Sequence, residues 1–283
     1  MAAEHDDTLR LMAVLAHPDD EALAMGGILA RYASEGVETA VVTATRGQRG
    51  RYKGVPPGEG HPGAEAMGRI REAELHAAAR TLGVRHLEIL DYMDGALDQA
   101  DAVEAASRIA ASVRRLRPHI VVTFDAAGAY GHPDHVAISQ LTTAAVVLAA
   151  DPHAARVDRA LVPHAVSKLY YIAPVEAWWA GYRAAFKQLT SNVEGVERVM
   201  HAWPEWAVTT RIDTRATWTT VWQAVSCHES QMAAYERLRH IPPEHHEGLW
   251  GSQTFYRAFS TVNGGRRREE DLFEGLRVGR AVR

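Results

Sequence analysis

Short apolar runs alternate with amphipathic segments along the first half of the chain. The apolar runs cover residues 9–16, 37–44, 86–90 and 119–124, and each has the length of a buried strand. Helical spacing of apolar positions covers residues 19–34, 65–82 and 100–116, and a further helix begins at residue 133. Strands that alternate with helices predict a parallel sheet covered on both faces. We therefore expect an α/β, Rossmann-like fold with a mostly parallel sheet.

The pattern becomes less regular beyond residue 150. A strand-like run covers residues 167–172 and a helix-like run covers residues 217–239, with an irregular, tryptophan-rich segment between them. We expect this part to add edge strands and a cap to the sheet. The chain is thus predicted to form one domain over residues 1–283, with a Rossmann-like core over 1–150 and the edge strands and cap over 151–283.

Composition and charge exclude several classes of protein. The hydrophobic fraction of 47% and the charged fraction of 23% are ordinary for a soluble globular protein. The net charge of −4 creates no general basic field, so no nucleic-acid or anionic-lipid partner is expected. No apolar stretch approaches the roughly 20 residues of a membrane helix. Because the first residues are acidic, unlike a secretory leader, we expect a cytoplasmic protein.

The single cysteine, Cys227, excludes an intrachain disulfide. It precedes His228, which raises the alternative of a nucleophilic cysteine. No third orienting group lies nearby in the sequence, and free cysteines usually behave as small hydrophobic residues. We therefore expect no catalytic role for Cys227.

Two histidine–aspartate motifs stand at the ends of predicted strands. HPDDE (residues 17–21) follows the first apolar run, and HPDH (residues 132–135) follows the run at 119–124 across a short glycine-containing loop. Either motif alone is typical of a helix N-terminus, with proline in the first turn and a carboxylate near the helix dipole. Ligands of parallel sheets bind beyond the carboxyl ends of the strands. The two motifs together predict one divalent-metal site with nitrogen and oxygen ligands.

The spacing within each motif separates possible roles. Asp19 and Asp20 are adjacent and point in different directions, so one can bind metal while the other faces a water molecule. His132 and His135 are three residues apart, so one can be a ligand while the other stays beside the site. A dinucleotide-binding fold is a weaker interpretation, because no G-x-G-x-x-G follows the first strand.

Longer stretches resemble a known family. AHPDDEALAMGG, TATRGQRG, REAELHAAARTLGV, DYMDG and YGHPDH, within residues 9–140, are similar to the LmbE-like (PIG-L) de-N-acetylases, and HESQ and DLFEGL match more weakly. These are zinc enzymes that remove the acetyl group of N-acetylglucosamine-type substrates. The resemblance implies a hydrolase that cleaves a linear amide of an amino sugar or glycoconjugate and releases acetate and a free amine.

The resemblance also implies the metal ligands. His17, Asp20 and His135 would bind one Zn²⁺ per chain and leave a position open for water. Such a two-histidine, one-carboxylate site also accepts other divalent metals, such as iron(II) or cobalt.

The resemblance assigns the catalytic groups as well. Asp19 would be the general base. His132 would either be charged and stabilise the oxyanion or protonate the leaving amine, and Asp134 would orient it. Tyr130 would help to bind the oxyanion. Glu21 would support its neighbours rather than catalyse.

Arg71 and Asp94 match positions that contact the sugar in relatives. The structural alternative is an ion pair of Arg71 with Glu74 or Glu35, and an Asp94 that only fixes the turn before Gly95. Gln48 and Gln253 stand where the family often has glutamate, and the glycine- and arginine-rich loop 45–63 is unusual in composition. These departures leave the substrate open.

Tryptophans in the second half of the chain are candidates for stacking on a sugar ring. Trp218 and Trp222 are four residues apart on a predicted helix and are expected in the core, whereas Trp178, Trp179, Trp203 and Trp206 are stacking candidates. The alternatives to a deacetylase are an amidase that cleaves a thiol–sugar conjugate and a non-catalytic metal- or sugar-binding relative. The partner is a small molecule in each case, and a homo-oligomer is left open.

Overall fold

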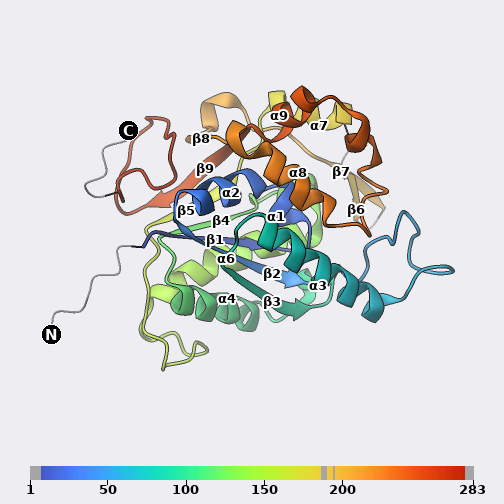
Figure 1. The fold of residues 1–283 in the computed structure, drawn as a ribbon. Coiled ribbons are helices and arrows are strands. Elements are labelled where there is room, and N and C mark those ends of the chain that lie inside the picture. Colours follow the sequence, from blue (N-terminus) through green and yellow to red (C-terminus); the bar gives the residue numbers. More distant parts are fainter. Residues whose placement is uncertain (1–7, 186–189, 194, 278–283) are drawn as a thin grey trace.

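A seven-stranded sheet forms the centre of the computed structural model, which describes residues 8–185, 190–193 and 195–277 (Figure 1). Its strand order is β3–β2–β1–β4–β5–β9–β8. The first five of these strands run parallel, whereas β9 is antiparallel to both of its neighbours. The strands are β1 (Arg10–Leu15), β2 (Glu38–Thr45), β3 (His86–Tyr92), β4 (Ile120–Thr123), β5 (Lys168–Ile172), β8 (Thr210–Asp213) and β9 (Ser252–Ser260).

Helices cover both faces of the sheet (Figure 1). On one face α8 (Trp218–Ser226) packs on α2 (Gly26–Ser34) and α3 (Ala64–Thr81). On the other, α4 (Ala102–Leu116) packs on α6 (Pro133–Ala150). The sheet is therefore enclosed, which explains why β1 and β4 are continuous apolar runs. This is the α/β architecture that the sequence predicts.

Short elements complete the described chain. They are the helices α1 (Asp20–Leu23), α5 (Gly128–Gly131), α7 (Glu176–Ala185) and α9 (Pro243–Trp250), the 3₁₀ turns η1 (Leu97–Gln99), η2 (Glu205–Ala207), η3 (Arg215–Thr217) and η4 (Glu236–His240), and the hairpin of β6 (Thr190–Val193) and β7 (Val196–Val199). The connection between β2 and α3 projects away from the sheet (Figure 1). In the described residues, no helix combines the length and the apolarity that crossing a membrane requires.

The helix predicted over residues 19–34 is wrong as a single element, because it divides into α1 and α2 around Ala24 and Met25. The side chain of Gln253 occupies the break. Its Nε2 donates to the carbonyl of Ala24 at 2.7 Å, and its Oε1 accepts from the N–H of Ile28 at 2.6 Å. In a continuous helix these two backbone groups would bond within the helix, and here they bond to a side chain of β9 instead.

The helix predicted over residues 217–239 is also too long. Helix α8 ends at Ser226, and turns follow. His228 bonds to Glu21, and the N–H and hydroxyl of Ser230 donate to the carboxylate of Glu74 at 2.7 Å each. These long-range bonds turn the chain inward, where helical periodicity alone would continue it along the surface.

The C-terminal segment is tied to the sheet by a buried ionic cluster. Lys168 on β5 and Glu269 are 0% and 1% exposed, and the Lys168 ammonium lies 2.8 Å from Glu269 Oε1. The same carboxylate accepts hydrogen bonds from Tyr170, Thr210 and Asn263 and pairs with Arg257, at distances of 2.6–2.8 Å. Because each charge is paired and hydrogen-bonded, the cluster can be buried without a large penalty.

The direction of the strand order changes at β1. From β1 the chain moves outward through β2 and β3 on one side, and it returns on the other side through β4 and β5. The carboxyl ends of β1 and β4 therefore lie side by side at a topological switch point, where α/β sheets bind their ligands. HPDDE follows β1, and HPDH follows β4 across a short turn.

Candidate functional site

A cavity of about 430 Å³ opens at the switch point. Residues that follow β1, β2, β3 and β4 line one part of it, and residues from β5 onward, in the second half of the chain, line the rest. The predicted site residues that line it are His17, Asp19, Asp20, Arg71, Asp94, Tyr130, His132 and His135. Asp134 is fully buried behind them.

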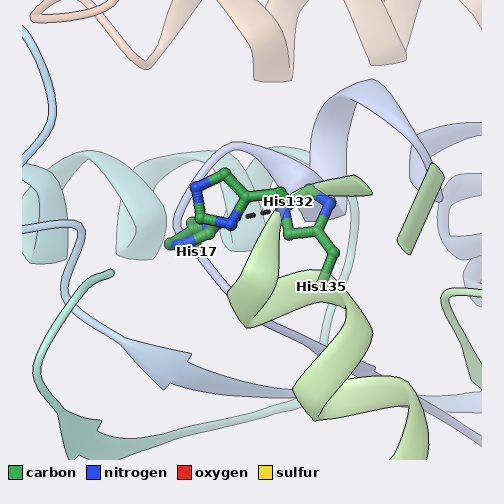
Figure 2. Close-up of side chains that lie close together, drawn as sticks. All are labelled: His17, His132 and His135. Carbon is green, nitrogen blue, oxygen red and sulfur yellow. Dashed lines mark hydrogen bonds between the residues drawn. The ribbon is translucent and has the colours of Figure 1, made fainter. Parts of the chain in front are cut away.

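The three predicted metal ligands face one another in this cavity. His17 Nδ1 lies 3.1 Å from His135 Nε2 and 3.8 Å from Asp20 Oδ2, and His135 Nε2 lies 3.6 Å from Asp20 Oδ1. Figure 2 shows the His17 and His135 rings in contact, with His132 beside them at the start of α6. Two imidazoles and one carboxylate at this spacing form a donor set that suits a tetrahedral divalent metal.

The tightest donor groups differ in part from the predicted set. Among the described residues, two groups have one donor atom per residue with all of these atoms within 4.8 Å of one another. They are His17–His132–His135 and His17–Asp94–Asp134. Asp20 presents different oxygens to the two histidines, and its Oδ2 also accepts the N–H groups of Ala16 and His17 at 3.2 and 2.8 Å. His132 thus lies beside the same two histidines in this geometry.

The second nitrogen of His17 contacts two carboxylates. Its Nε2 lies 3.2 Å from both Asp94 Oδ1 and Asp134 Oδ2. A ligand histidine commonly donates its other N–H to a carboxylate, which fixes the tautomer that presents a lone pair to the metal. Here a proton on Nε2 leaves Nδ1 to face Asp20 and His135.

The side-chain contacts of Asp134 differ from those expected of a residue that orients His132. Its carboxylate contacts His17 and accepts the N–H groups of Gly95 and Leu97 at 2.7 and 3.1 Å. Only its backbone N–H reaches His132, donating to Nδ1 at 3.2 Å. Asp134 lies in the first turn of α6, and its side chain contacts His17 while only its backbone contacts His132.

Buried negative charge indicates that this site needs a cation. Asp20, Asp94 and Asp134 are all less than 9% exposed and surround His17. Burial lowers the pKa of His17, but hydrogen bonds to Asp134 and Asp94 and the charge of Asp20 outweigh it and raise the pKa to about 10. A proton on His17 therefore balances the carboxylates, and a divalent cation would fit the same electrostatic need.

Asp19 stands beside this donor set in an unusual backbone conformation. It precedes α1 with φ 97° and ψ −24°, a left-handed region that a residue with a Cβ rarely adopts. Its Oδ2 accepts a hydrogen bond from the Tyr235 hydroxyl and pairs with Arg71, each at 3.1 Å. The carboxylate is thus fixed from two sides at the edge of the cavity.

Arg71 has partners other than those considered from the sequence. Besides pairing with Asp19, its guanidinium donates to the carbonyls of Pro18 and Gly47. Glu74 instead bonds Ser230, and Glu35 pairs with Arg31 and Arg277. The alternative of an Arg71–Glu74 or Arg71–Glu35 ion pair is therefore wrong.

His132 is the N-cap of α6, and its Nδ1 accepts the N–H of Asp134. Burial and the neighbouring His17 lower its pKa to about 4. The ring is therefore neutral near pH 7, with Nδ1 as the acceptor and the proton on Nε2. Of the two roles considered, a standing positive charge is disfavoured, whereas Nε2–H is a hydrogen-bond donor beside the cavity.

Tyr130 enters the cavity from a strained turn between β4 and α6. Ala129 has φ 60° and ψ −76°, and Gly128 has φ 61° with Val136 N only 2.7 Å from where a Cβ would stand. Asp125 holds the turn, accepting the Ala129 N–H at 2.9 Å and the Trp203 indole N–H at 2.8 Å. The turn brings the Tyr130 ring to 5.2 Å from that of His135.

The side chains of Gln48 and Gln253 bond to the backbone. Gln48 accepts from the N–H groups of Arg46 and Asp94 and donates to the carbonyl of Tyr92, while Gln253 bridges α1 and α2 as described above. Asp94 accepts the N–H of Arg49 at 2.9 Å in addition to contacting His17. Asp94 therefore fixes more than the turn before Gly95.

Of the four tryptophans predicted as stacking candidates, only Trp178 lines the cavity. Trp179 is buried elsewhere, Trp203 stacks on Tyr256, and Trp206 is 87% exposed. Trp218 and Trp222, predicted in the core, are half-buried and pack against its surface, with Trp222 on His246 and Trp250. Cys227 does not line the cavity, and His228 bonds to Glu21, so nothing supports a nucleophilic cysteine.

Sequence reasoning missed Tyr182 and Tyr235, which line the cavity; Tyr182 is buried and Tyr235 is half-buried. Both come from the irregular second half of the chain, where no periodicity or motif marks them. They lie at the site only because the segments after β5 and α8 fold back over the carboxyl edge of the sheet.

Comparison with known proteins agrees with this geometry. Residues 12–146 match the model of the PIG-L family, described as GlcNAc-PI de-N-acetylase. A Thermobifida fusca protein named 1D-myo-inositol 2-acetamido-2-deoxy-alpha-D-glucopyranoside deacetylase is 35% identical over 247 residues, which cover 79% of this chain and 84% of that protein.

Two solved structures have the same fold. A conserved protein from Thermus thermophilus is 26% identical, with a TM-score of 0.63 over 91% of this chain and 98% of that one. The N,N'-diacetylchitobiose deacetylase from Pyrococcus horikoshii is 22% identical, with a TM-score of 0.65 over 89% and 84%. The family match, the deacetylase relative and the paired motifs agree: the chain belongs to the PIG-L family of metal-dependent de-N-acetylases and is an enzyme that removes an N-acetyl group from a GlcNAc-type sugar.

Proposed function

We propose that the chain is a zinc-dependent de-N-acetylase that acts on an N-acetylglucosamine unit joined to a polyol, such as 1D-myo-inositol. The observation that supports it most is the convergence of His17, Asp20 and His135 beside Asp19 and His132 in one cavity. The substrate follows the name of the Thermobifida fusca relative and of a Kineococcus radiotolerans relative that is 33% identical over 96% of this chain.

His17, Asp20 and His135 would hold the metal, one ion per chain. A bound Zn²⁺ would polarise the acetamide carbonyl and lower the pKa of a water molecule. Asp94 and Asp134 would keep the proton of His17 on Nε2, so that Nδ1 faces the ion. Iron(II) or cobalt fits the same donors, and metal content after expression in defined media distinguishes them.

Asp19 would accept a proton from the attacking water. Its Oδ2 contacts Arg71 and Tyr235, so rotation of the carboxylate is restricted. His132 Nε2–H would donate toward the developing negative oxygen or the leaving nitrogen, and Tyr130 would add a donor from the opposite turn. In the overall reaction, water adds to the carbonyl, the C–N bond breaks, the amine gains a proton and acetate is released.

The cavity suits a sugar with a further substituent. Its volume of about 430 Å³ lies within the usual range for small-molecule sites. Asp94 and Trp178, which both line it, offer an acceptor and a ring face to a polyol. The contacts of Arg71 support a role at Asp19, beside any contact with the sugar.

A deacetylation screen tests the proposal. We expect the zinc-loaded protein to release acetate fastest from the inositol glycoside of N-acetylglucosamine, compared with free N-acetylglucosamine, its nucleotide conjugate and chitooligosaccharides. Chelation should abolish the release and added Zn²⁺ restore it. Preferential cleavage of a thiol–sugar amide would support the amidase alternative, and binding without turnover of any substrate would support a non-catalytic relative.

A further inference from the structure

Glu21 and His228 form a buried pair outside the cavity. Glu21 lies in α1 and His228 follows α8, and both are 0% exposed. His228 Nε2 lies 2.6 Å from Glu21 Oε1. Neither residue lines the cavity, so neither can touch a substrate bound there. A buried pair that joins two distant segments needs an explanation other than substrate binding.

The other oxygen of Glu21 holds the backbone of Asp19. Glu21 Oε2 accepts the N–H of Asp19 at 2.9 Å. Asp19 has φ 97°, a conformation that is strained in a residue with a Cβ and persists only where its surroundings impose it. The bond from Glu21 is one of the contacts that impose it, and this backbone conformation directs the Asp19 side chain into the cavity.

His228 also starts the turn that reaches the Asp19 carboxylate. Ser230 anchors this turn on Glu74, and Tyr235 then donates its hydroxyl hydrogen bond to Asp19 Oδ2. One segment after α8 thus fixes Asp19 twice, through Glu21 at the backbone and through Tyr235 at the carboxylate.

We propose that Glu21 and His228 are positioning residues for Asp19: His228 orients the Glu21 carboxylate, and Glu21 holds the left-handed backbone that presents the base. The inference rests on the proposed function, in which Asp19 accepts the proton of water. It assigns Glu21 and His228 a geometric role, which depends on the reach of the Glu21 side chain rather than on its charge.

A matched pair of substitutions separates reach from charge. Glu21→Gln keeps the length of the side chain and loses the charge, whereas Glu21→Asp keeps the charge and shortens the reach by about one carbon–carbon bond, ~1.5 Å. We expect Glu21→Asp to lose about 10- to 100-fold in kcat, because a small misplacement of a catalytic group costs that much. Glu21→Gln should retain at least ten times more kcat than Glu21→Asp, with KM and metal content as in the parent for both.

His228 offers a second pair with the same logic. Glutamine can place its amide nitrogen near the position of His228 Nε2, whereas asparagine is too short to reach Glu21. We expect His228→Gln to retain more kcat than His228→Asn. If Glu21→Asp fails to fold, this second pair decides the question. Glu65→Gln, on the exposed start of α3, is the control substitution.

Hydrogen exchange of the Asp19 amide gives a readout that does not require activity. Exchange at Asp19 should be faster in Glu21→Asp than in the parent or in Glu21→Gln. Equal kcat and equal exchange in all variants would overturn the inference, as would a loss in Glu21→Gln as large as that in Glu21→Asp. A parent that deacetylates nothing, but shows the expected exchange pattern, would instead refute the proposed function.

Discussion

At the scale of single residues, the carboxylates behind His17 make a prediction about metal affinity. Asp94 and Asp134 each lie 3.2 Å from His17 Nε2, and they orient the ring. Removing such a partner usually costs about 10- to 100-fold in metal affinity. We expect Asp134→Asn and Asp94→Asn to bind Zn²⁺ that much more weakly in competition with a chelator.

Glu104→Gln, on the outer part of α4, is the control for these substitutions and should leave the dissociation constant at the parental value. An unchanged constant in both Asp94→Asn and Asp134→Asn would show that His17 needs no orienting carboxylate. An unchanged constant in one of them alone would assign the role to the other.

Asp19 should differ from the ligands in what its loss removes. Asp19→Asn preserves the shape of the side chain but cannot accept the proton of water, so kcat should fall at least ~100-fold while the metal stays bound. His17→Ala, Asp20→Ala and His135→Ala should each lose most of the metal. Elemental analysis of the four purified variants checks both statements, and a metal-free Asp19→Asn would place Asp19 among the ligands.

At the scale of elements, the sequence predicts most of the parallel core but not where two helices end. Strands such as β1 and β4 and helices such as α3 and α4 carry their own periodicity, and the HPDDE and HPDH motifs follow strand ends, so their position at the sheet edge could be predicted. The ends at Leu23 and Ser226 depend on Gln253 and on Glu21, which are distant in sequence. Periodicity contains no information on such contacts.

The break between α1 and α2 should depend on Gln253. Gln253→Met keeps the length of the side chain but removes the acceptor for Ile28 N–H and the donor to the Ala24 carbonyl. Buried backbone groups left unpaired cost about 1–3 kcal/mol, so the free energy of unfolding should fall by that amount. Urea unfolding measures it, with Gln223→Met on the exposed side of α8 as the control; equal stability of the two variants would mean that water replaces Gln253.

At the scale of the whole molecule, the Glu269 cluster couples stability to pH. Burial raises the pKa of Glu269, but hydrogen bonds from Lys168, Asn263, Tyr170 and Thr210 outweigh it and lower the pKa from 4.5 to about 2. As the pH falls, Glu269 therefore binds a proton in the unfolded chain before it does so in the folded protein. The ionised carboxylate stabilises the fold above pH 4.5.

This contribution should be lost as the pH falls from 4.5 toward 2. We expect the difference in unfolding free energy between the parent and Glu269→Gln to be constant above that window and to shrink within it. Glu270→Gln, at an exposed neighbouring position, is the control. A difference that does not change with pH would show that Glu269 contributes by shape alone.

The cavity is also a property of the whole molecule, and here the sequence is least informative. HPDDE and HPDH can be recognised in the sequence because the residues of each motif are adjacent. Tyr182 and Tyr235 have no local sequence pattern, and they reach the cavity only through the way the second half folds over the first. Glu21 and His228 each lie in a short motif, but their pairing depends on the same folding. The orientation of Asp134 toward His17 likewise depends on where two loops meet.

The residues around the site are divided unequally along the chain. Every proposed ligand, together with Asp94 and Asp134, precedes residue 150, whereas His228 and Tyr235 come from the segment after α8. Because a chain emerges from the ribosome with its N-terminal part first, the metal-binding edge can form before the covering segment is made. We therefore expect nascent protein to capture its ion through an open face, and the finished enzyme to exchange that ion slowly.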